Sequence, residues 1–541
     1  MKNLTVKIFV GLFVVAAVLL QSCKKDSETY SFLLNERGAF VEEPGGTTSL
    51  GFTAINISSV TPTTVPQGWS VTVDMTERRI SVTAPTTFPD DPKTLADGEE
   101  EEEENTNVRF GTVYLTGRSS GGSSVSTSLY VSLAETVDLT GQPSNCYIIN
   151  KSNARYCIDV TRKGEDTEAT MSPASVAILW ETPYKVIEFP KLVDGKAYFY
   201  HAIGTDDDEK EFFNHGNALL GAFDAAGNLL WSWHLWCAEF DPADEQVELG
   251  GEVMMKRNLG AGVVSGTSEE DILASYGVYY QWGRKDPFSN ATTVYGPEGN
   301  TLDMHSWPSC EGYTIDPVWN AQIGRKSGDY LYNGTVEFTL SHPATYISYA
   351  DEKDISNPNQ TWLRSDVPGH RNDRLWGTYF EKEAVGAATV LLSKSAFDPC
   401  PAGYRIPLIA PLKFTGNDVE SYTTEGVWLY IDSQRSVKAW YPYAGSRFSK
   451  MDASGKQIGI LGYTEGALGL YQFSYAASIW SATLEFVQEI SVGTSCNSDD
   501  LTVTGYSSTG YRPEFVYEGP YARSFALAVR CVREDANGIV R

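Results

Sequence analysis

The feature that most constrains the fold is a period-two alternation of apolar and polar residues between residues 30 and 135. Apolar side chains recur at every second position, and short Gly- and Pro-containing breaks separate the runs. Successive side chains of a strand point to opposite faces, so this pattern predicts half-buried antiparallel strands. The positions are Trp69, Val71, Val73, Ile80, Val82, Val113, Leu115, Val125, Leu129, Val131 and Leu133.

Several such strands within about a hundred residues predict an immunoglobulin-like β-sandwich over residues 30–136. The composition extends this prediction to the whole chain, because it contains 30 Tyr, 23 Phe and 13 Trp and lacks long helix-forming stretches. A length of 541 residues suggests about three or four domains. The predicted fold class is therefore mostly β and multidomain.

A second β module is predicted over residues 137–250. A turn at Asp224–Asn228 lies between two apolar runs, which indicates a hairpin. In the run after it, Trp231 and Trp233 share one strand face, and His234 and Trp236 share the other. Core packing is the favoured interpretation, because tryptophan buries a large area. The alternative is a row of aromatic rings that stacks on sugars, and His234 is interpreted as structural.

The charge of the chain restricts its partners. The net charge is −27, which argues against nucleic acid, because phosphate recognition requires clustered Lys and Arg. Part of this charge lies in the unbroken run Glu99–Glu104. Calcium loops space their oxygen ligands with turn residues, so this run is interpreted as a solvated, self-repelling loop.

Sequence signatures of catalysis are missing from the chain. It contains no HExxH, no phosphate-binding glycine-rich loop, no GxSxG elbow and no CxxC pair. Acidic residues are numerous, but nothing singles out two of them as a glycosidase pair. The sequence therefore predicts no enzyme, no cofactor and no metal site.

The beginning of the chain carries an export pattern. Lys2 and Lys7 precede an apolar run of 13 residues, Ile8–Leu20, which is shorter than the roughly 20 residues that a membrane-spanning helix needs. The run ends in Leu20-Gln21-Ser22-Cys23, which resembles the lipobox of bacterial lipoproteins. The resemblance implies a signal peptide over residues 1–22, a lipid such as palmitate on Cys23 and a tether over residues 23–29. The order Cys23-Lys24-Lys25-Asp26 is similar to signals that send Bacteroidetes lipoproteins to the outer face of the outer membrane.

Three further resemblances concern the modules. Residues 30–136 resemble small sandwich modules of Bacteroidetes, through Pro66-Gln67-Gly68-Trp69 and Ile80–Pro85. Residues 137–250 are similar to fimbrillin-like surface lipoproteins, through Asn145–Ile149 and Gly216–Leu220. Residues 251–541 resemble the Fibrobacter succinogenes major paralogous domain family, which implies an α+β, C-type lectin-like domain with two helices. The phrases that carry this last resemblance are Met254–Ala261, Tyr276–Phe288, Leu375–Gly377, Asp398–Pro407, Tyr443–Arg447, Ile479–Thr483 and Ala528–Val532.

Seven cysteines follow Cys23, so at least one stays unpaired if every disulfide is internal. A Cys400–Cys531 bond is the favoured pair, because a loop-rich domain gains about 4–5 kcal/mol from closing so long a loop. Cys146 with Cys157, across a predicted hairpin, and Cys310 with Cys496 are weaker alternatives. Ligand contacts in the lectin-like domain would come from Arg447, Tyr471, Tyr475 and Trp480. Trp480-Ser481-Ala482 lacks the Asn and Asp oxygens of calcium-dependent lectins.

Three functions compete at this stage. The first is a non-catalytic lipoprotein of the cell surface that binds a host or environmental glycan or protein, as an adhesin or at a pilus tip. The second is a polymerising pilus subunit, released by cleavage after Arg37 and assembled with other subunits. The third is a glycan-binding protein or enzyme of a polysaccharide-utilisation system. In the first and third functions the lipid on Cys23 holds the chain to the membrane, whereas in the second it only delivers the chain before cleavage.

Overall fold

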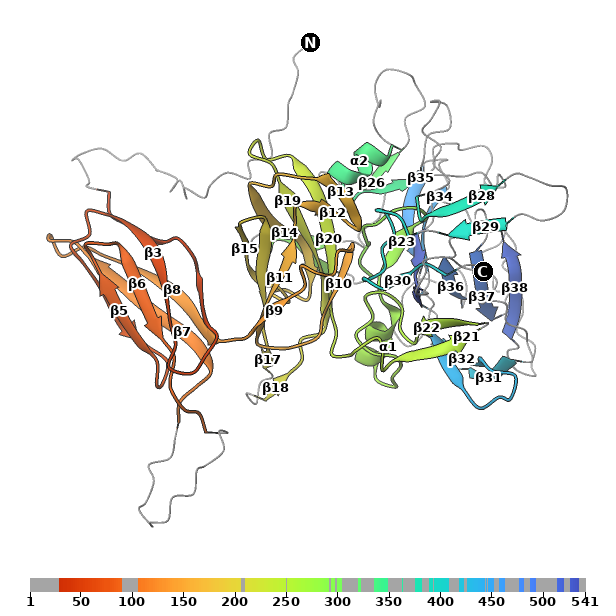
Figure 1. The fold of residues 1–541 in the computed structure, drawn as a ribbon, viewed down its shortest axis with the longest axis horizontal. Helices are drawn as coiled ribbons and strands as arrows, with labels where there is room; N and C mark the ends of the chain where they lie inside the picture. Colours follow the sequence, from red (N-terminus) through yellow and green to blue (C-terminus); the bar gives the residue numbers. More distant parts are fainter. Residues whose placement is uncertain are drawn as a thin grey trace, which may run out of the picture.

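The computed structural model describes residues 29–89, 106–205, 210–249, 251–290, 293–296, 299–303, 320–322, 335–348, 362, 375–381, 389–392, 394–407, 418–422, 426–442, 444, 446–451, 457–462, 476–480, 487–492, 513–519 and 526–534. Over these residues the chain is mostly β and multidomain, as predicted. Figure 1 shows the N-terminal strands at one end of the longest axis, the middle strands next to them, and the C-terminal strands at the other end.

The N-terminal region is a sandwich of two four-stranded sheets. The apolar residues that alternate in the sequence meet between the sheets, and Ile80, Val82, Val113 and Leu115 are fully buried there. One sheet has the order β1 (Ser31–Leu34), β3 (Thr47–Ile55), β6 (Arg79–Thr83) and β5 (Ser70–Asp74). The other has the order β2 (Gly38–Val41), β8 (Ser124–Leu133), β7 (Phe110–Arg118) and β4 (Ser59–Thr64).

The middle region pairs a six-stranded sheet with a four-stranded one. The first has the order β10 (Cys146–Ile149), β20 (Leu229–Cys237), β19 (Gly216–Phe223), β14 (Ser175–Thr182), β24 (Thr293–Tyr295) and β25 (Thr301–Asp303). The second has the order β15 (Glu188–Val193), β16 (Lys196–His201), β11 (Ala154–Asp159) and β9 (Thr136–Asp138). Two short hairpins, β12 (Arg162–Lys163) with β13 (Asp166–Thr170) and β17 (Gly204–Thr205) with β18 (Glu211–Phe212), complete it.

The described part of the C-terminal region contains several sheets and two short helices, α1 (Glu269–Tyr276) and α2 (Val336–Ser341). One sheet has the order β21 (Gln246–Leu249), β22 (Glu252–Met255), β40 (Val532–Arg533) and β30 (Tyr404–Arg405). The largest has the order β35 (Gln457–Gly462), β34 (Ser446–Met451), β39 (Ala526–Ala528), β36 (Ala476–Trp480), β37 (Val487–Val492) and β38 (Pro513–Gly519), with β23 (Tyr279–Gln281) paired to β39. A three-stranded sheet has the order β31 (Val419–Tyr422), β32 (Gly426–Tyr430) and β33 (Lys438–Pro442). Two further sheets have two strands each, β26 (Asn320–Gln322) with β27 (Tyr346–Ser348) and β28 (Thr378–Glu381) with β29 (Thr389–Leu392).

Strand β20 connects the middle and C-terminal regions through its two faces. Trp231 and Trp233 pack into the core of the middle region, whereas Trp236 packs into a core formed largely by C-terminal residues. Each of the three is at most 1% exposed, so core packing is confirmed for these rings. Because β24 and β25 also extend the sheet of the middle region, the two regions share both a sheet and a core. The boundary at residue 250 stays a prediction.

The N-terminal sandwich and the middle region contact each other through Asn153 and several aromatic side chains, and we call this contact the joint. Asn153 Oδ1 accepts hydrogen bonds from Ser132 Oγ at 2.7 Å and Tyr200 OH at 2.6 Å, and its Nδ2 donates to Leu133 O at 3.1 Å. The Tyr130 and Tyr200 hydroxyls lie 3.0 Å apart, and the Tyr130 ring stacks on Phe189 with centroids 5.5 Å apart. These contacts fix the N-terminal sandwich against the middle region.

We predict that Asn153→Ala and Asn153→Gly both loosen this joint. Each removes the acceptor of two buried hydroxyls, which costs about 2 kcal/mol. Asn153 has a φ of 51°, in the left-handed region of the backbone. This conformation destabilises an alanine by about 1 kcal/mol and does not destabilise a glycine. Small-angle X-ray scattering should show a broader range of shapes for both variants than for the unmodified chain. Urea unfolding should give the alanine variant a lower unfolding free energy than the glycine variant.

The matched control is Asn56→Ala. Asn56 also has a positive φ, 53°, but among the described residues its side chain donates to Thr29 O, within the N-terminal region. Its scattering profile should equal that of the unmodified chain. Identical scattering of the unmodified chain, both Asn153 variants and the Asn56 variant would show that Asn153 does not hold the joint.

Candidate functional site

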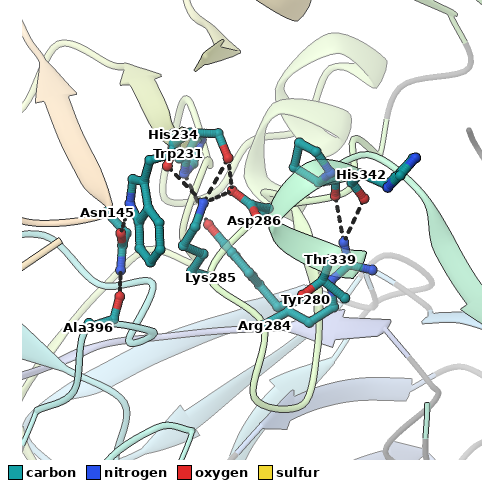
Figure 2. A network of polar contacts seen from close by, with 12 residues as sticks. Asn145, Trp231, His234, Tyr280, Arg284, Lys285, Asp286, Thr339, His342 and Ala396 are labelled. Atoms are coloured by element: carbon teal, nitrogen blue, oxygen red, sulfur yellow. Dashed lines mark hydrogen bonds and ion pairs between the residues drawn. The ribbon is translucent and has the colours of Figure 1, made fainter. Parts of the chain in front are cut away.

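The side chains with the richest chemistry meet where β20 faces the C-terminal region (Figure 2). Lys285 lies at the centre, and its Nζ donates to Asp286 Oδ1 at 2.5 Å, to Ser232 Oγ at 2.7 Å and to Ser232 O at 2.9 Å. The same nitrogen lies 4.5 Å from the centre of the Trp231 ring. Lys285 and Asp286 are each 2% exposed, so this is a fully buried ion pair. Burial lowers the pKa of Lys285 to about 8, against the opposing attraction of Asp286.

Asn145 ties the start of β10 to the C-terminal region. Its Oδ1 accepts a hydrogen bond from Trp231 Nε1 at 3.0 Å, and its Nδ2 donates to Ala396 O at 2.7 Å and Asp398 O at 2.8 Å. Asp398 in turn accepts from the backbone N–H groups of Cys400 and Ile406. Burial raises the pKa of Asp398 to about 6, and the nearby Lys394 lowers it in part. The segment around residues 396–406 is thereby fixed to the middle region.

His234 occupies the opposite face of β20 from Trp231. Its Nε2 lies 2.8 Å from Asn217 Oδ1, and its Nδ1 lies 3.1 Å from Tyr280 OH and 3.4 Å from Cys146 Sγ. Burial lowers the pKa of His234 to about 3 and raises that of Cys146. A reactive cysteine–histidine pair needs a thiolate and access for substrate, and both residues here are neutral and 1% exposed. The pair is therefore part of the core, in agreement with the structural interpretation of His234.

Arg284 fastens helix α2 to the same region. Its guanidinium donates to Thr345 O at 2.6 Å and Pro343 O at 2.7 Å, just beyond the end of α2, and to Gln281 Oε1 at 3.0 Å. Trp376 Nε1 donates to Arg284 O at 3.1 Å, and the Trp376 ring lies 5.5 Å from the Trp282 ring. Both tryptophans are buried, as their size predicts.

The cysteines differ in part from the prediction. Cys400 and Cys531, the pair that the sequence favours, form a disulfide with Cα atoms 6.1 Å apart, beside the pairing of β30 with β40. The Cys146–Cys157 alternative is wrong, because both thiols are free and buried. Cys146 pairs with His234 in one sheet, whereas Cys157 pairs with Tyr198 in the other, so the two strands do not form a hairpin. Cys310 and Cys496 lie outside the described residues.

The other predicted site residues divide into three groups. Arg37 is exposed between β1 and β2. Arg447 lies on β34 and Trp480 on β36, and the backbones of these strands flank β39 from its two sides. Cys23, Tyr471 and Tyr475 lie outside the described residues. The sequence interpretation missed Lys285, Asp286 and Asn145, although charges inside the aromatic phrase Tyr279–Phe288 are a signal of a buried ion pair.

Neither a cluster of metal ligands nor a membrane-spanning helix occurs among the described residues. Among those residues, no group of three or more His, Cys, Asp or Glu side chains is arranged to hold a metal ion. No helix within them combines the length and hydrophobicity that crossing a membrane requires.

Comparisons with known proteins do not assign a family. No protein-family model matches the chain, and no curated protein matches it. Among solved structures, the chain is similar to SGBP-B of the Bacteroides ovatus mixed-linkage glucan utilization locus, bound to a heptasaccharide, with 12% identity, 37% of this chain and 43% of that chain covered and a TM-score of 0.12. The human desmocollin-1 ectodomain is 11% identical, with 39% of this chain and 41% of that chain covered and a TM-score of 0.14. The Yersinia pseudotuberculosis adhesin InvE is 10% identical, with 44% of this chain and 70% of that chain covered and a TM-score of 0.13. The chain spans less than half the length of the first two, and likeness at this level assigns neither fold family nor function.

We predict that His234 makes the protein sensitive to acid. Its folded pKa of about 3 lies below its ordinary value of 6.5, so only the unfolded chain binds this proton between those values. The stability that neutral His234 contributes is complete above pH 6.5 and falls by about 1.4 kcal/mol per pH unit as the pH drops toward 3.

Urea unfolding of the unmodified chain and of His234→Gln at several pH values tests this. The difference in unfolding free energy between them should be constant above pH 6.5 and should shrink below it, and other titrating groups cancel in that difference. Parallel curves from pH 7.5 to pH 4 would contradict the assignment.

Proposed function

We propose that this chain is a binding protein of the cell surface, an adhesin or receptor rather than an enzyme. The observation that carries the proposal is the end-to-end order of the regions along the longest axis, with a fixed joint after the N-terminal sandwich (Figure 1). A lipid on Cys23 would attach the N-terminal end to the outer membrane. The sandwich would then act as a stiff spacer that presents the C-terminal region to a glycan or protein partner.

The buried site supports binding over catalysis. Lys285, Asp286, His234 and Cys146, which are side chains that catalysis uses, are all at least 98% buried and satisfied by internal contacts. They stabilise the junction that positions the C-terminal sheets, and they offer no atom to an external substrate. A rigid scaffold with exposed loops is the usual build of a binding protein.

The test is a binding screen with the chain from Lys24 to Arg541, which lacks the acylated cysteine. We expect saturable binding on a glycan array or to immobilised collagen, fibronectin or laminin, and no hydrolysis of the bound glycan. The middle and C-terminal regions share a core, so residues 252–541 alone are unsuitable. No binding on either panel would contradict the proposal.

The alternative of a polymerising pilus subunit has one geometric feature in its favour. Arg37 is exposed directly after β1, an edge strand that contributes the buried Phe32 to the sandwich core. Cleavage after Arg37 would release β1 and open a strip of the core to a strand from another subunit. Against it, Arg37 O accepts a hydrogen bond from Tyr130 N at 2.8 Å, so this peptide bond is held in the sheet.

Mass spectrometry of the surface protein separates the two functions. The adhesin proposal predicts chains that begin with acylated Cys23. Chains that begin at Gly38 in high-molecular-weight assemblies would instead support the pilus subunit. An Arg37→Ala variant should leave the adhesin unchanged and should abolish such assemblies if they exist.

A further inference from the structure

The three-stranded sheet β31–β33 carries aromatic side chains on its outer face. Val427 and Leu429 of β32 are fully buried, whereas Trp428 and Tyr430, which alternate with them, are only partly buried. Trp428 lies directly opposite Trp440 of β33, with ring centroids 5.4 Å apart. We call the outer face of Trp428, Tyr430 and Trp440 the aromatic platform.

Polar side chains of both charges surround the aromatic platform. Lys438 Nζ lies 4.9 Å from the centre of the Trp428 ring, and the Arg435 guanidinium lies 5.6 Å from that of Tyr430. Glu420 Oε1 lies 3.3 Å from Lys438 Nζ, and Asp432 lies in the loop after β32, three residues before Arg435. The surround therefore offers both hydrogen-bond donors and hydrogen-bond acceptors to a ligand. Lys438, Arg435 and Glu420 are exposed, so they can exchange their present contacts for those of a ligand.

The loop that joins β32 to β33 is held in one conformation. The Asp432 carboxylate accepts hydrogen bonds from Val437 N at 2.7 Å, Ser436 Oγ at 2.7 Å and Ser436 N at 2.9 Å. A loop that is already ordered loses little conformational entropy when a ligand binds. The rings on either side of it are therefore presented in a fixed arrangement.

Trp440 adds a hydrogen-bond donor that lacks an acceptor. Its Nε1 is buried and has no hydrogen-bond partner among the described residues, and Trp440 as a whole is 4% exposed. A Cβ on Gly426 would lie 2.4 Å from the Trp440 ring, so the indole rests directly on the β32 backbone. An unpaired buried N–H costs free energy, and a ligand could supply its acceptor only if the Trp440 ring shifted.

We infer that the aromatic platform binds a neutral oligosaccharide of pyranose sugars. The C–H face of a pyranose stacks on an aromatic ring, and its hydroxyls both donate to carboxylates and accept from Lys and Arg N–H groups. The carboxylates around the platform and the net charge of −27 disfavour an acidic polysaccharide. This inference rests on the proposed binding function and names the ligand class and the contact surface.

The test uses the chain from Lys24 to Arg541 with cellohexaose, laminarihexaose, xylohexaose and mannohexaose as neutral probes and polygalacturonate as the acidic one. Isothermal titration should show binding to at least one neutral probe, and Trp428→Ala should weaken it by about tenfold or more, as expected for an aromatic anchor. Tyr184→Ala is the matched control, because Tyr184 is 43% exposed with Lys185 Nζ 5.6 Å from its ring centre. This control should bind as the unmodified chain does.

A second measurement does not depend on the folding of a variant. Hydroxyl-radical footprinting of the unmodified chain should show that the bound probe protects Trp428 and Tyr430 but not Tyr184. Neutral probes that bind equally well to Trp428→Ala and leave Trp428 unprotected would overturn the inference while the binding function stands. Binding to polygalacturonate or to matrix proteins alone would also overturn it. A chain that binds no probe and no matrix protein would contradict the proposed function itself.

Discussion

The structure depends on one strand, β20, that is buried on both faces. A strand in this position must be apolar at almost every residue, and Leu229–Cys237 meets that requirement with three tryptophans. Its two faces belong to different cores, so packing on one side fixes the position of the other. The C-terminal sheets therefore have a defined orientation relative to the middle region.

The polar groups near β20 follow from this double burial. A buried charge is tolerated only when it is paired and its remaining hydrogen-bonding capacity is used, and Lys285 meets both conditions through Asp286 and Ser232. His234 meets the same demand in another way, because it stays neutral and is bonded through both ring nitrogens. Such networks add little net stability, but they are satisfied in only one arrangement of the two cores. Their role here is to specify that arrangement.

Much of the fold could be predicted from local patterns. Alternation is a property of single strands, so the sandwich strands and the two faces of β20 were visible in the sequence. Pairings between segments that are distant in the sequence could not be predicted in this way. The addition of β24 and β25 to the middle sheet, and the placement of Cys146 and Cys157 in different sheets, depend on contacts that no local period encodes. The aromatic platform was missed for the same reason, because Trp428 and Trp440 become neighbours only when β32 pairs with β33.

The two junctions of the molecule differ in kind, and this difference has a mechanical consequence. The middle and C-terminal regions share a sheet and a core, so neither can unfold without exposing the apolar surface of the other. The N-terminal sandwich has its own core and meets its neighbour through Asn153, a few rings and exposed ion pairs such as Lys191–Glu36. Exposed ion pairs contribute at most about 1 kcal/mol each, so this joint is the weaker of the two. In a chain tethered at its N-terminal end, force from a bound partner would therefore open the joint at Asn153 before it disturbed the surface that holds the partner.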